Sequence, residues 1–185
     1  RKNNRRALDV FLASVERRAL HMARIATGNT EEALDIVQDT MMKLVQCYGS
    51  KSEHEWKALF YRILENRIMD WHRRQKVRNR WRVWLEKLGL GNDDGNSATS
   101  ALEQLPDPEQ RQPWQHLDSE KRMNTLEQAI NNLPLRQQQA FLLRAWEGLS
   151  VAETALAMGC SGGSVKTHYS RATHALRDIL QEYVP

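Results

Sequence analysis

The fold of this chain is decided by residues 148–180, which read GLSVAETALAMGCSGGSVKTHYSRATHALRDIL. Ser150 and Glu153 have the spacing of a capping box, in which each side chain accepts a hydrogen bond from the other residue's backbone N–H. Gly159 is expected to end this first helix, because glycine adopts the left-handed backbone conformation at low cost. Ser161 can cap a second helix directly afterwards. Two helices joined by so short a turn predict a helix-turn-helix.

The second of these helices has two chemically different faces. Val165, Tyr169, Ala172 and Leu176 recur at helical spacing and predict the buried face. The opposite face has no carboxylate and carries Ser164, Lys166, Thr167, Ser170, Arg171 and His174. A helix that enters the major groove needs short side chains for close approach and donors for phosphates and base edges. We therefore interpret this face as DNA-binding, the alternative being an ordinary polar face in contact with water.

Outside this motif, the chain of 185 residues divides by charge into three segments. Residues 1–84 hold 18 Lys and Arg against 10 Asp and Glu, residues 85–118 hold 2 against 7, and residues 119–185 hold 7 against 6. The middle segment is rich in Gly, Asn, Ser and Pro, a composition typical of flexible linkers. The pattern predicts an all-α protein with two small helical domains joined by a flexible acidic linker, the C-terminal domain carrying the helix-turn-helix.

The first domain is expected to contain three helices, over about 5–27, 30–48 and 56–76. The second of them is expected to bury Leu34, Val37, Met41, Leu44 and Val45. This assignment leaves carboxylates and apolar side chains together outside the core, at Asp35, Ile36, Asp39 and Met42. Such a mixture occurs on surfaces that bind a partner protein, and it also occurs on ordinary solvated helices.

The third helix carries a polar and cationic stripe, because Arg62, Asn66, Met69 and Arg73 fall at i, i+4, i+7 and i+11. Basic and aromatic side chains continue along and beyond it: Arg67, Arg74, Lys76, Arg78, Arg80, Arg82, Tyr61, Trp71, His72, Trp81 and Trp84. Cations attract phosphates and aromatic faces stack on unpaired bases, so the mixture favours nucleic acid. The alternative is that the tryptophans belong to the core, which we prefer for Trp56 and Trp71. A separate short amphipathic piece is expected over 81–90.

Catalysis, metal binding and membrane insertion find no support in the sequence. The six histidines are scattered, and Cys47 and Cys160 lie outside any metal-ligand spacing. Both thiols are expected to be buried or half-buried in a reducing compartment. No apolar run approaches the length of a membrane span, and no signal peptide is recognisable. We expect a soluble cytoplasmic protein that is no enzyme and has no catalytic residue, metal, cofactor or small-molecule substrate.

In combination, these motifs resemble those of bacterial RNA polymerase sigma factors, most closely the extracytoplasmic-function (ECF) group of the sigma-70 family. The fragments that carry the resemblance are Asp35–Thr40, Leu59–Asn66 with Asp70 and Arg73-Arg74, Leu133-Pro134, Phe141–Arg144, Glu147–Ser150 and Ser164–Thr167. The compact members of this family keep only region two, a linker and region four. The resemblance therefore implies region two over 1–84, the linker over 85–118, region four over 119–185, and a role in transcription initiation.

The resemblance also implies partners, residue by residue. Asp35, Ile36, Gln38, Asp39 and Met42 would meet the clamp helices of the largest subunit of core RNA polymerase, and region four would meet its flap. The residues implied in binding and melting the −10 promoter element are Lys51, Ser52, His54, Tyr61, Arg62, Asn66, Met69, Arg73 and Arg74, with the loop over 49–54 holding a flipped base. The outer face of the second motif helix would read the −35 element.

An anti-sigma factor would be a further partner, with Ile36 and Met42 expected to be exposed to it. A rival interpretation is a stand-alone helix-turn-helix regulator, which would bind palindromic duplex DNA without polymerase. The stripe from Arg62 to Arg73 is unexplained by that rival.

Overall fold

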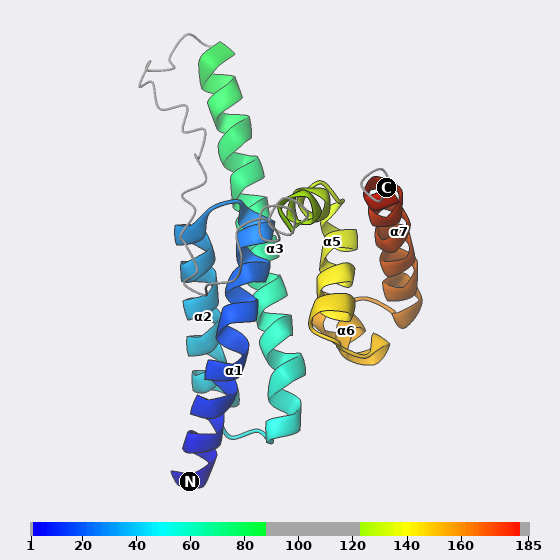
Figure 1. The fold of residues 1–185 in the computed structure, drawn as a ribbon. Coiled ribbons are helices and arrows are strands. Elements are labelled where there is room, and N and C mark those ends of the chain that lie inside the picture. The colour runs from blue at the N-terminus through cyan, green and yellow to red at the C-terminus, as the bar shows by residue number, and fades with distance from the viewer. Residues whose placement is uncertain (1, 88–122, 182–185) are drawn as a thin grey trace, which may run out of the picture.

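The structure is a computed structural model that describes residues 2–87 and 123–181, and all regular secondary structure in these ranges is helical (Figure 1). The predicted all-α class is thus confirmed. A first group of antiparallel helices comprises α1 (Lys2–Thr27), α2 (Thr30–Tyr48) and α3 (Glu53–Lys87). A second group comprises helical residues 123–131, α5 (Leu135–Phe141), the π-helical turn η1 (Leu142–Trp146), α6 (Val151–Met158) and α7 (Gly162–Gln181). The expected linker falls mostly on residues outside the described ranges.

The core of the first group forms around aromatic side chains of α3. Trp56 and Phe60 are buried, and the ring of Phe11 from α1 packs edge-to-face on Phe60 with 6.1 Å between ring centroids. The indole N–H of Trp56 donates to the carbonyl oxygen of Tyr48 over 3.2 Å, which satisfies its one polar atom. Burying a large aromatic side chain contributes about 2–3 kcal/mol, so these contacts hold the three helices together.

The buried face of α2 differs from the expected one. Ile36 is 5% exposed and belongs to the core, whereas Leu34 and Val45 are 50% and 47% exposed. Apolar residues occupy more than half of this helix's circumference, so periodicity alone did not identify the side that faces α1 and α3. Thr40 is also buried, and its hydroxyl donates to the carbonyl oxygen of Ile36 over 2.7 Å.

Helix α3 is longer than predicted. It runs unbroken from Glu53 to Lys87, so the expected end at Lys76 and the separate piece over 81–90 are both wrong. No glycine or proline lies between these bounds, and nothing in the sequence forces the helix to stop. The last turns of α3 project beyond the other helices of the first group (Figure 1).

The helix-turn-helix is confirmed in detail. The Glu153 N–H donates to Oγ of Ser150 over 3.2 Å and the Ser150 N–H donates to Oε2 of Glu153 over 2.8 Å, completing the capping box of α6. Gly159 ends α6 at φ 61° and ψ 43°, in the left-handed region. Ser161 then accepts the N–H of Ser164 at the start of α7. Local sequence signals thus determine the geometry of the motif.

Candidate functional site

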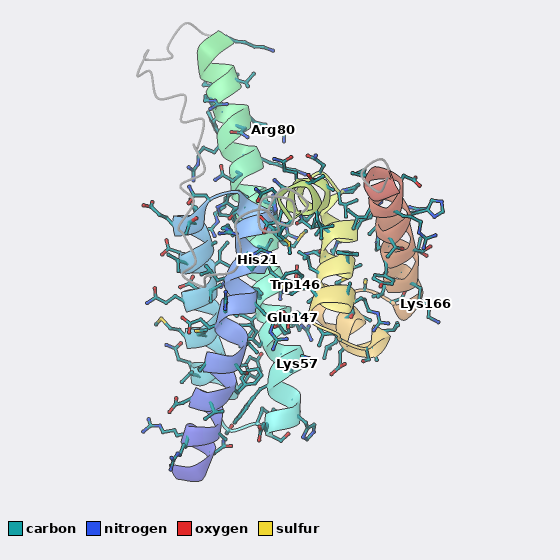
Figure 2. All side chains as sticks on the ribbon, in the orientation of Figure 1. His21, Lys57, Arg80, Trp146, Glu147 and Lys166 are labelled. Atoms are coloured by element: carbon teal, nitrogen blue, oxygen red, sulfur yellow. The ribbon has the colours of Figure 1, made fainter. Side chains whose placement is uncertain are left out.

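The outer face of α7 is exposed as the sequence predicts. Lys166, Thr167, Ser170, Arg171 and His174 are exposed and Ser164 is half-buried, while Val165, Ala172 and Leu176 are buried on the other side. Figure 2 shows Lys166 on the side of α7 that faces away from the other helices. The Thr167 hydroxyl donates to the carbonyl oxygen of Gly163 over 3.1 Å, so its lone pairs still face solvent. The face offers two cations and several short polar groups to a ligand.

A second exposed face lies on α2 and mixes carboxylates with apolar side chains. Asp35, Gln38 and Asp39 are exposed, and Met42 is 50% exposed. Leu34 and Val45, expected in the core, join Met42 on this surface instead. Ile36 was expected here and is corrected to the core. The sequence does hold a signal that Leu34 and Val45 share this surface, because Leu34, Gln38, Met42 and Val45 fall at i, i+4, i+8 and i+11.

We call the surface of Leu34, Asp35, Gln38, Asp39, Met42 and Val45 the α2 face. Asp39 forms an ion pair with Arg67 of α3, with 3.5 Å between Oδ2 and the guanidinium nitrogen. This contact holds the carboxylate close to the junction of the two helices. An exposed apolar stripe beside fixed charges is the usual composition of a surface that binds another protein.

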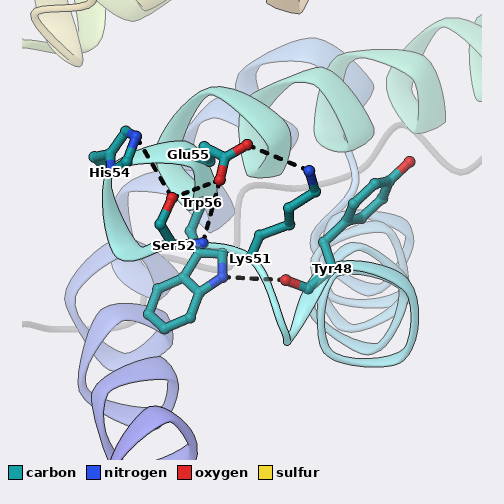
Figure 3. A network of polar contacts seen from close by, with 6 residues as sticks. All are labelled: Tyr48, Lys51, Ser52, His54, Glu55 and Trp56. Carbon is teal, nitrogen blue, oxygen red and sulfur yellow. Dashed lines mark hydrogen bonds and ion pairs between the residues drawn. The ribbon is translucent and has the colours of Figure 1, made fainter.

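The loop between α2 and α3 is held by a polar network (Figure 3). Ser52 donates to Oε2 of Glu55 from its hydroxyl over 2.5 Å and from its backbone N–H over 3.2 Å. Nζ of Lys51 lies 3.5 Å from Oε1 of Glu55, and Nε2 of His54 lies 3.4 Å from the Ser52 hydroxyl. The hydrogen bonds from Ser52 lower the pKa of Glu55, so this carboxylate stays charged and caps α3. Lys51 and Ser52 in this loop and His54 in the first turn of α3 are all exposed.

The stripe along α3 is mostly accessible. Arg62, Asn66, Arg73 and Arg74 are exposed and Met69 is half-buried. Arg73 donates to Oδ1 of Asp70 over 3.2 Å, which orients its guanidinium along the helix. The stripe thus lies on α3, and the loop with Lys51 and Ser52 leads directly into the start of the same helix.

Tyr61 is the exception among the expected DNA-binding residues, because it is completely buried. Its hydroxyl donates to Oε2 of Glu147 over 2.5 Å, and Nζ of Lys57 donates to the Glu147 carbonyl oxygen over 3.0 Å. Arg18 of α1 lies 3.7 Å from the same carboxylate. Figure 2 shows Lys57 and Glu147 where the two groups of helices meet. The expectation that Tyr61 binds DNA is therefore wrong for this conformation. Tyr61 instead forms a contact between the two groups of helices, out of reach of DNA.

A second buried contact joins the groups through Glu65 of α3. Nε2 of Gln139 in α5 donates to Oε2 of Glu65 over 2.5 Å. Burial raises the pKa of Glu65 to about 7, an effect that the Gln139 hydrogen bond and the charge of Arg136 offset only in part. The sequence signal for this residue was its place between Tyr61, Leu64 and Ile68, the buried positions of the helix.

A third contact between the groups is half-exposed. Glu127 lies 3.5 Å from Nε2 of His21 and 3.8 Å from Arg24, and the His21 ring stacks on Trp146 with 4.9 Å between centroids. Burial lowers the pKa of His21, so the ring is mainly neutral near pH 7. Within residues 2–87 and 123–181, polar contacts therefore join the two groups of helices at three places, around Glu147, Glu65 and Glu127, and sequence analysis identified none of them.

The exposure of the cysteines, the presence of metal ligands and the presence of membrane-spanning helices can also be compared with the sequence analysis. Cys47 is exposed, contrary to expectation, and Cys160 is half-buried. Residues 2–87 and 123–181 contain no group of three or more His, Cys, Asp or Glu side chains arranged to hold a metal ion. In the same ranges no helix combines the length and apolar character that crossing a membrane requires.

Two regions of the chain match families of known proteins. The Sigma-70 region 2 family matches residues 11–78, and the Sigma-70, region 4 family matches residues 123–176. The chain is 30% identical to the RNA polymerase sigma-E factor of Streptomyces avermitilis over 163 residues, covering 88% of this chain and 78% of that protein. It is 26% identical to the ECF RNA polymerase sigma factor SigE of Mycolicibacterium smegmatis, covering 90% of this chain but only 58% of that relative.

Two solved structures share the fold. The sigma factor RpoE from Bartonella quintana, solved in complex with the anti-sigma factor NepR, matches with a TM-score of 0.63 and 24% identity over 98% of both chains. CnrH, solved in complex with the cytosolic domain of CnrY, matches with a TM-score of 0.62 and 17% identity, covering 96% of this chain and 90% of CnrH. The similarity extends over both groups of helices.

Proposed function

Because the chain belongs to the sigma-70 family of RNA polymerase sigma factors, we propose that it binds core RNA polymerase, recognises the −35 and −10 elements of a promoter and initiates transcription there. In this proposal residues 1–84 act as region two, 85–118 as the linker and 119–185 as region four. The stand-alone regulator is not favoured, since both sigma regions match in order along the chain. The protein acts on DNA as a recognition factor in the cytoplasm and catalyses no reaction itself.

Polymerase binding is assigned to the α2 face, and this surface is the observation that carries the proposal. It exposes Leu34, Met42 and Val45 next to Asp35 and Asp39, although a protein that worked alone would gain stability by burying such side chains. Apolar contacts would supply affinity, and the carboxylates would select a basic partner surface and fix the orientation. Region four would add a second contact to the polymerase flap.

Promoter reading is assigned to the two cationic surfaces. The outer face of α7 would enter the major groove at the −35 element, where Arg171 reads a base edge and Lys166 contacts phosphate. The exposed loop with Lys51, Ser52 and His54, and the stripe with Arg62, Asn66, Met69, Arg73 and Arg74, would hold the unpaired strand of the −10 element. Unstacking a base costs a few kcal/mol, and capture by these groups would offset that cost.

Control by an anti-sigma factor is a further part of the proposal. RpoE and CnrH, which share this fold, were each solved in complex with a second protein. An inhibitor that covers the α2 face would bury the same apolar side chains that core polymerase needs, so the two would compete. We propose such competition as the means by which this chain is held inactive.

The assignment of the α2 face is tested with Asp39→Arg. Charge reversal at the exposed Asp39 should weaken binding to purified core polymerase about tenfold or more, because it places a cation against a surface selected for carboxylates. The matched control is Asp9→Arg, a charge reversal at an exposed position of α1. Affinity is measured by fluorescence titration of labelled chain, and circular dichroism checks that both variants are folded. Equal affinity of Asp39→Arg and the parent chain would refute this assignment.

The rival function is tested by a gel shift with promoter DNA. A sigma factor should bind duplex promoter DNA tightly only in the presence of core polymerase, because the two groups of helices that carry its DNA-binding surfaces are packed together in the free chain. Tight, sequence-specific binding of a palindromic duplex by the free chain would support the stand-alone regulator instead.

A further inference from the structure

Glu65 is a buried acidic side chain at the junction of the two groups of helices, and the proposed function gives it no role. It lies on α3, is 2% exposed, and accepts a hydrogen bond of 2.5 Å from Nε2 of Gln139 on α5. A neutral amide at this position could accept the same hydrogen bond. Burying an ionised carboxyl group costs far more free energy than burying an amide, so the presence of an acid here needs its own explanation.

The immediate surroundings of Glu65 are mostly apolar. Met22 and Ala26 of α1, Ile68 of α3 and Leu142 of η1 line the space beside it, and this space is too small to hold a water molecule. Water therefore cannot solvate a negative charge on the carboxyl group while the two groups of helices are packed together. The packing itself keeps the carboxyl group away from solvent.

The nearest polar side chains of the second group are engaged with other atoms. Gln138 donates its side-chain N–H to a backbone carbonyl oxygen over 3.1 Å. Arg136 donates to another backbone carbonyl oxygen over 2.8 Å and to Oε1 of Gln139 over 3.5 Å. Gln139 therefore lies between the cation and Glu65, and the positive charge of Arg136 compensates an ionised Glu65 only in part.

The other charged and titratable groups at this junction form contacts of their own. These contacts join Arg18, Lys57 and Tyr61 to Glu147, and His21 and Arg24 to Glu127. Burial lowers the pKa of His21, so protonation of this ring at acidic pH favours separation of the groups. The effect of Glu65 has the opposite direction, and a comparison of variants must keep His21 constant.

Separation of the two groups would place the Glu65 carboxyl group in water, where it releases its proton to the solvent. Burial raises the pKa of Glu65 to about 7 in the packed arrangement, against an ordinary value of 4.5. Packing is therefore favoured at low pH, and this advantage is lost as pH rises through about 7. Over the whole window the ratio of separated to packed chains should rise by about 300-fold through this group.

We propose that Glu65 and Gln139 form a latch that holds the two groups of helices together while Glu65 is protonated. When Glu65 ionises, the carboxylate is drawn towards water and the packing loosens. The fraction of separated molecules thus depends on pH in the free chain, before any partner binds. The proposal does not rest on the proposed function, because it concerns the arrangement of the chain alone.

The latch is tested with a cysteine that separation exposes. Ile68→Cys places a thiol beside Glu65, and Cys47→Ser with Cys160→Ser removes the native thiols. When closing is faster than labelling, the rate of thiol labelling is proportional to the separated fraction. Rates are measured with and without Glu65→Gln at each pH, which cancels the titration of the thiol and of His21. The ratio of the two rates, without to with Glu65→Gln, should rise about tenfold from pH 6 to pH 8.5.

Two further variants show whether an ionisable group at this position is responsible. Glu65→Asp keeps a carboxyl group and should keep most of the pH dependence. Glu16→Gln removes an exposed carboxyl group of α1 and should leave the labelling rate unchanged at every pH. A rate ratio for Glu65→Gln that stays constant from pH 6 to pH 8.5 would overturn the proposal.

Unfolding of the whole chain is distinguished from separation by a second probe. Val37→Cys, in the same background, places the thiol in the buried core of the first group, which separation leaves intact. It should be labelled at least tenfold more slowly than Ile68→Cys, and circular dichroism checks that both variants are folded. Equal labelling rates at the two positions would mean that the chain unfolds as one unit, and would overturn the latch.

Discussion

Glu65 shows how one buried carboxyl group makes the stability of the whole chain depend on pH. The pKa of Glu65 is about 7 in the folded chain, against an ordinary value of 4.5. Between these values the folded chain binds a proton that the unfolded chain has released, so stability falls as pH rises through this window. Above about pH 7 the penalty for charging the buried group is complete, at about 3 kcal/mol.

We predict that Glu65→Gln removes this dependence. The neutral amide has no charge to bury, so the variant should gain stability relative to the parent chain from about pH 5 upwards, by up to about 3 kcal/mol near pH 8. Urea unfolding at a series of pH values measures the difference. Glu16→Gln, at an exposed position of α1, is the control and should show a constant difference. A constant difference for Glu65→Gln as well would mean that folding does not shift the pKa of Glu65.

Arg171 tests base reading by α7. If its guanidinium reads a base edge, Arg171→Ala should cost about 1–3 kcal/mol of binding on the matched promoter and much less on one with a scrambled −35 element. Lys166→Ala is the comparison, because loss of a phosphate contact should weaken both promoters alike. Competition binding with the polymerase complex measures both variants. Equal loss on both promoters for Arg171→Ala would contradict base reading.

At the scale of the elements, the helix-turn-helix depends on Gly159. Its φ of 61° lies in the left-handed region, and nothing lies within 4 Å of where a Cβ would stand. Gly159→Ala should therefore cost about 1 kcal/mol of stability through backbone strain alone. Gly163→Ala is the control, because Gly163 lies within α7 and its Cβ would meet only ordinary contacts. Thermal unfolding compares the two, and equal stabilities would show that the turn adapts without strain.

Some helices could be predicted from the sequence and others could not. Ser150, Glu153 and Gly159 act on their own backbone neighbours, so the bounds of α6 and the start of α7 were predictable. The orientation of α2 was not, because Leu34, Ile36 and Val45 are all apolar and only packing against α1 and α3 decides which of them is buried. The same holds for Tyr61 and Glu65, whose partners Glu147 and Gln139 lie more than 70 residues away.

At the scale of the whole molecule, the two groups of helices are packed together through Tyr61, Glu65 and Glu127. This packing covers one side of α3 while leaving its cationic stripe exposed. A promoter presents its two elements apart from each other, so we expect the groups to separate when the chain binds polymerase and promoter.

The chain offers a direct test of this separation, since its only two cysteines lie in different groups. Fluorophores on Cys47, which is exposed, and Cys160, which is half-buried, should show energy transfer in the free chain and lose most of it in the promoter complex with core polymerase. A control with the labelled chain and core polymerase, but without promoter DNA, separates the effect of the polymerase from that of the promoter. Unchanged transfer in the full complex would show that the packed arrangement is the active one.

If this chain directs core polymerase to start sites, transcription in vitro should depend on it. Purified chain and core polymerase are mixed with a library of genomic fragments, and the 5′ ends of the transcripts are mapped. We expect defined start sites, preceded by shared −10 and −35 sequences, that disappear when the chain is omitted or carries Asp39→Arg. Transcripts with no defined start, or the same starts without the chain, would contradict it.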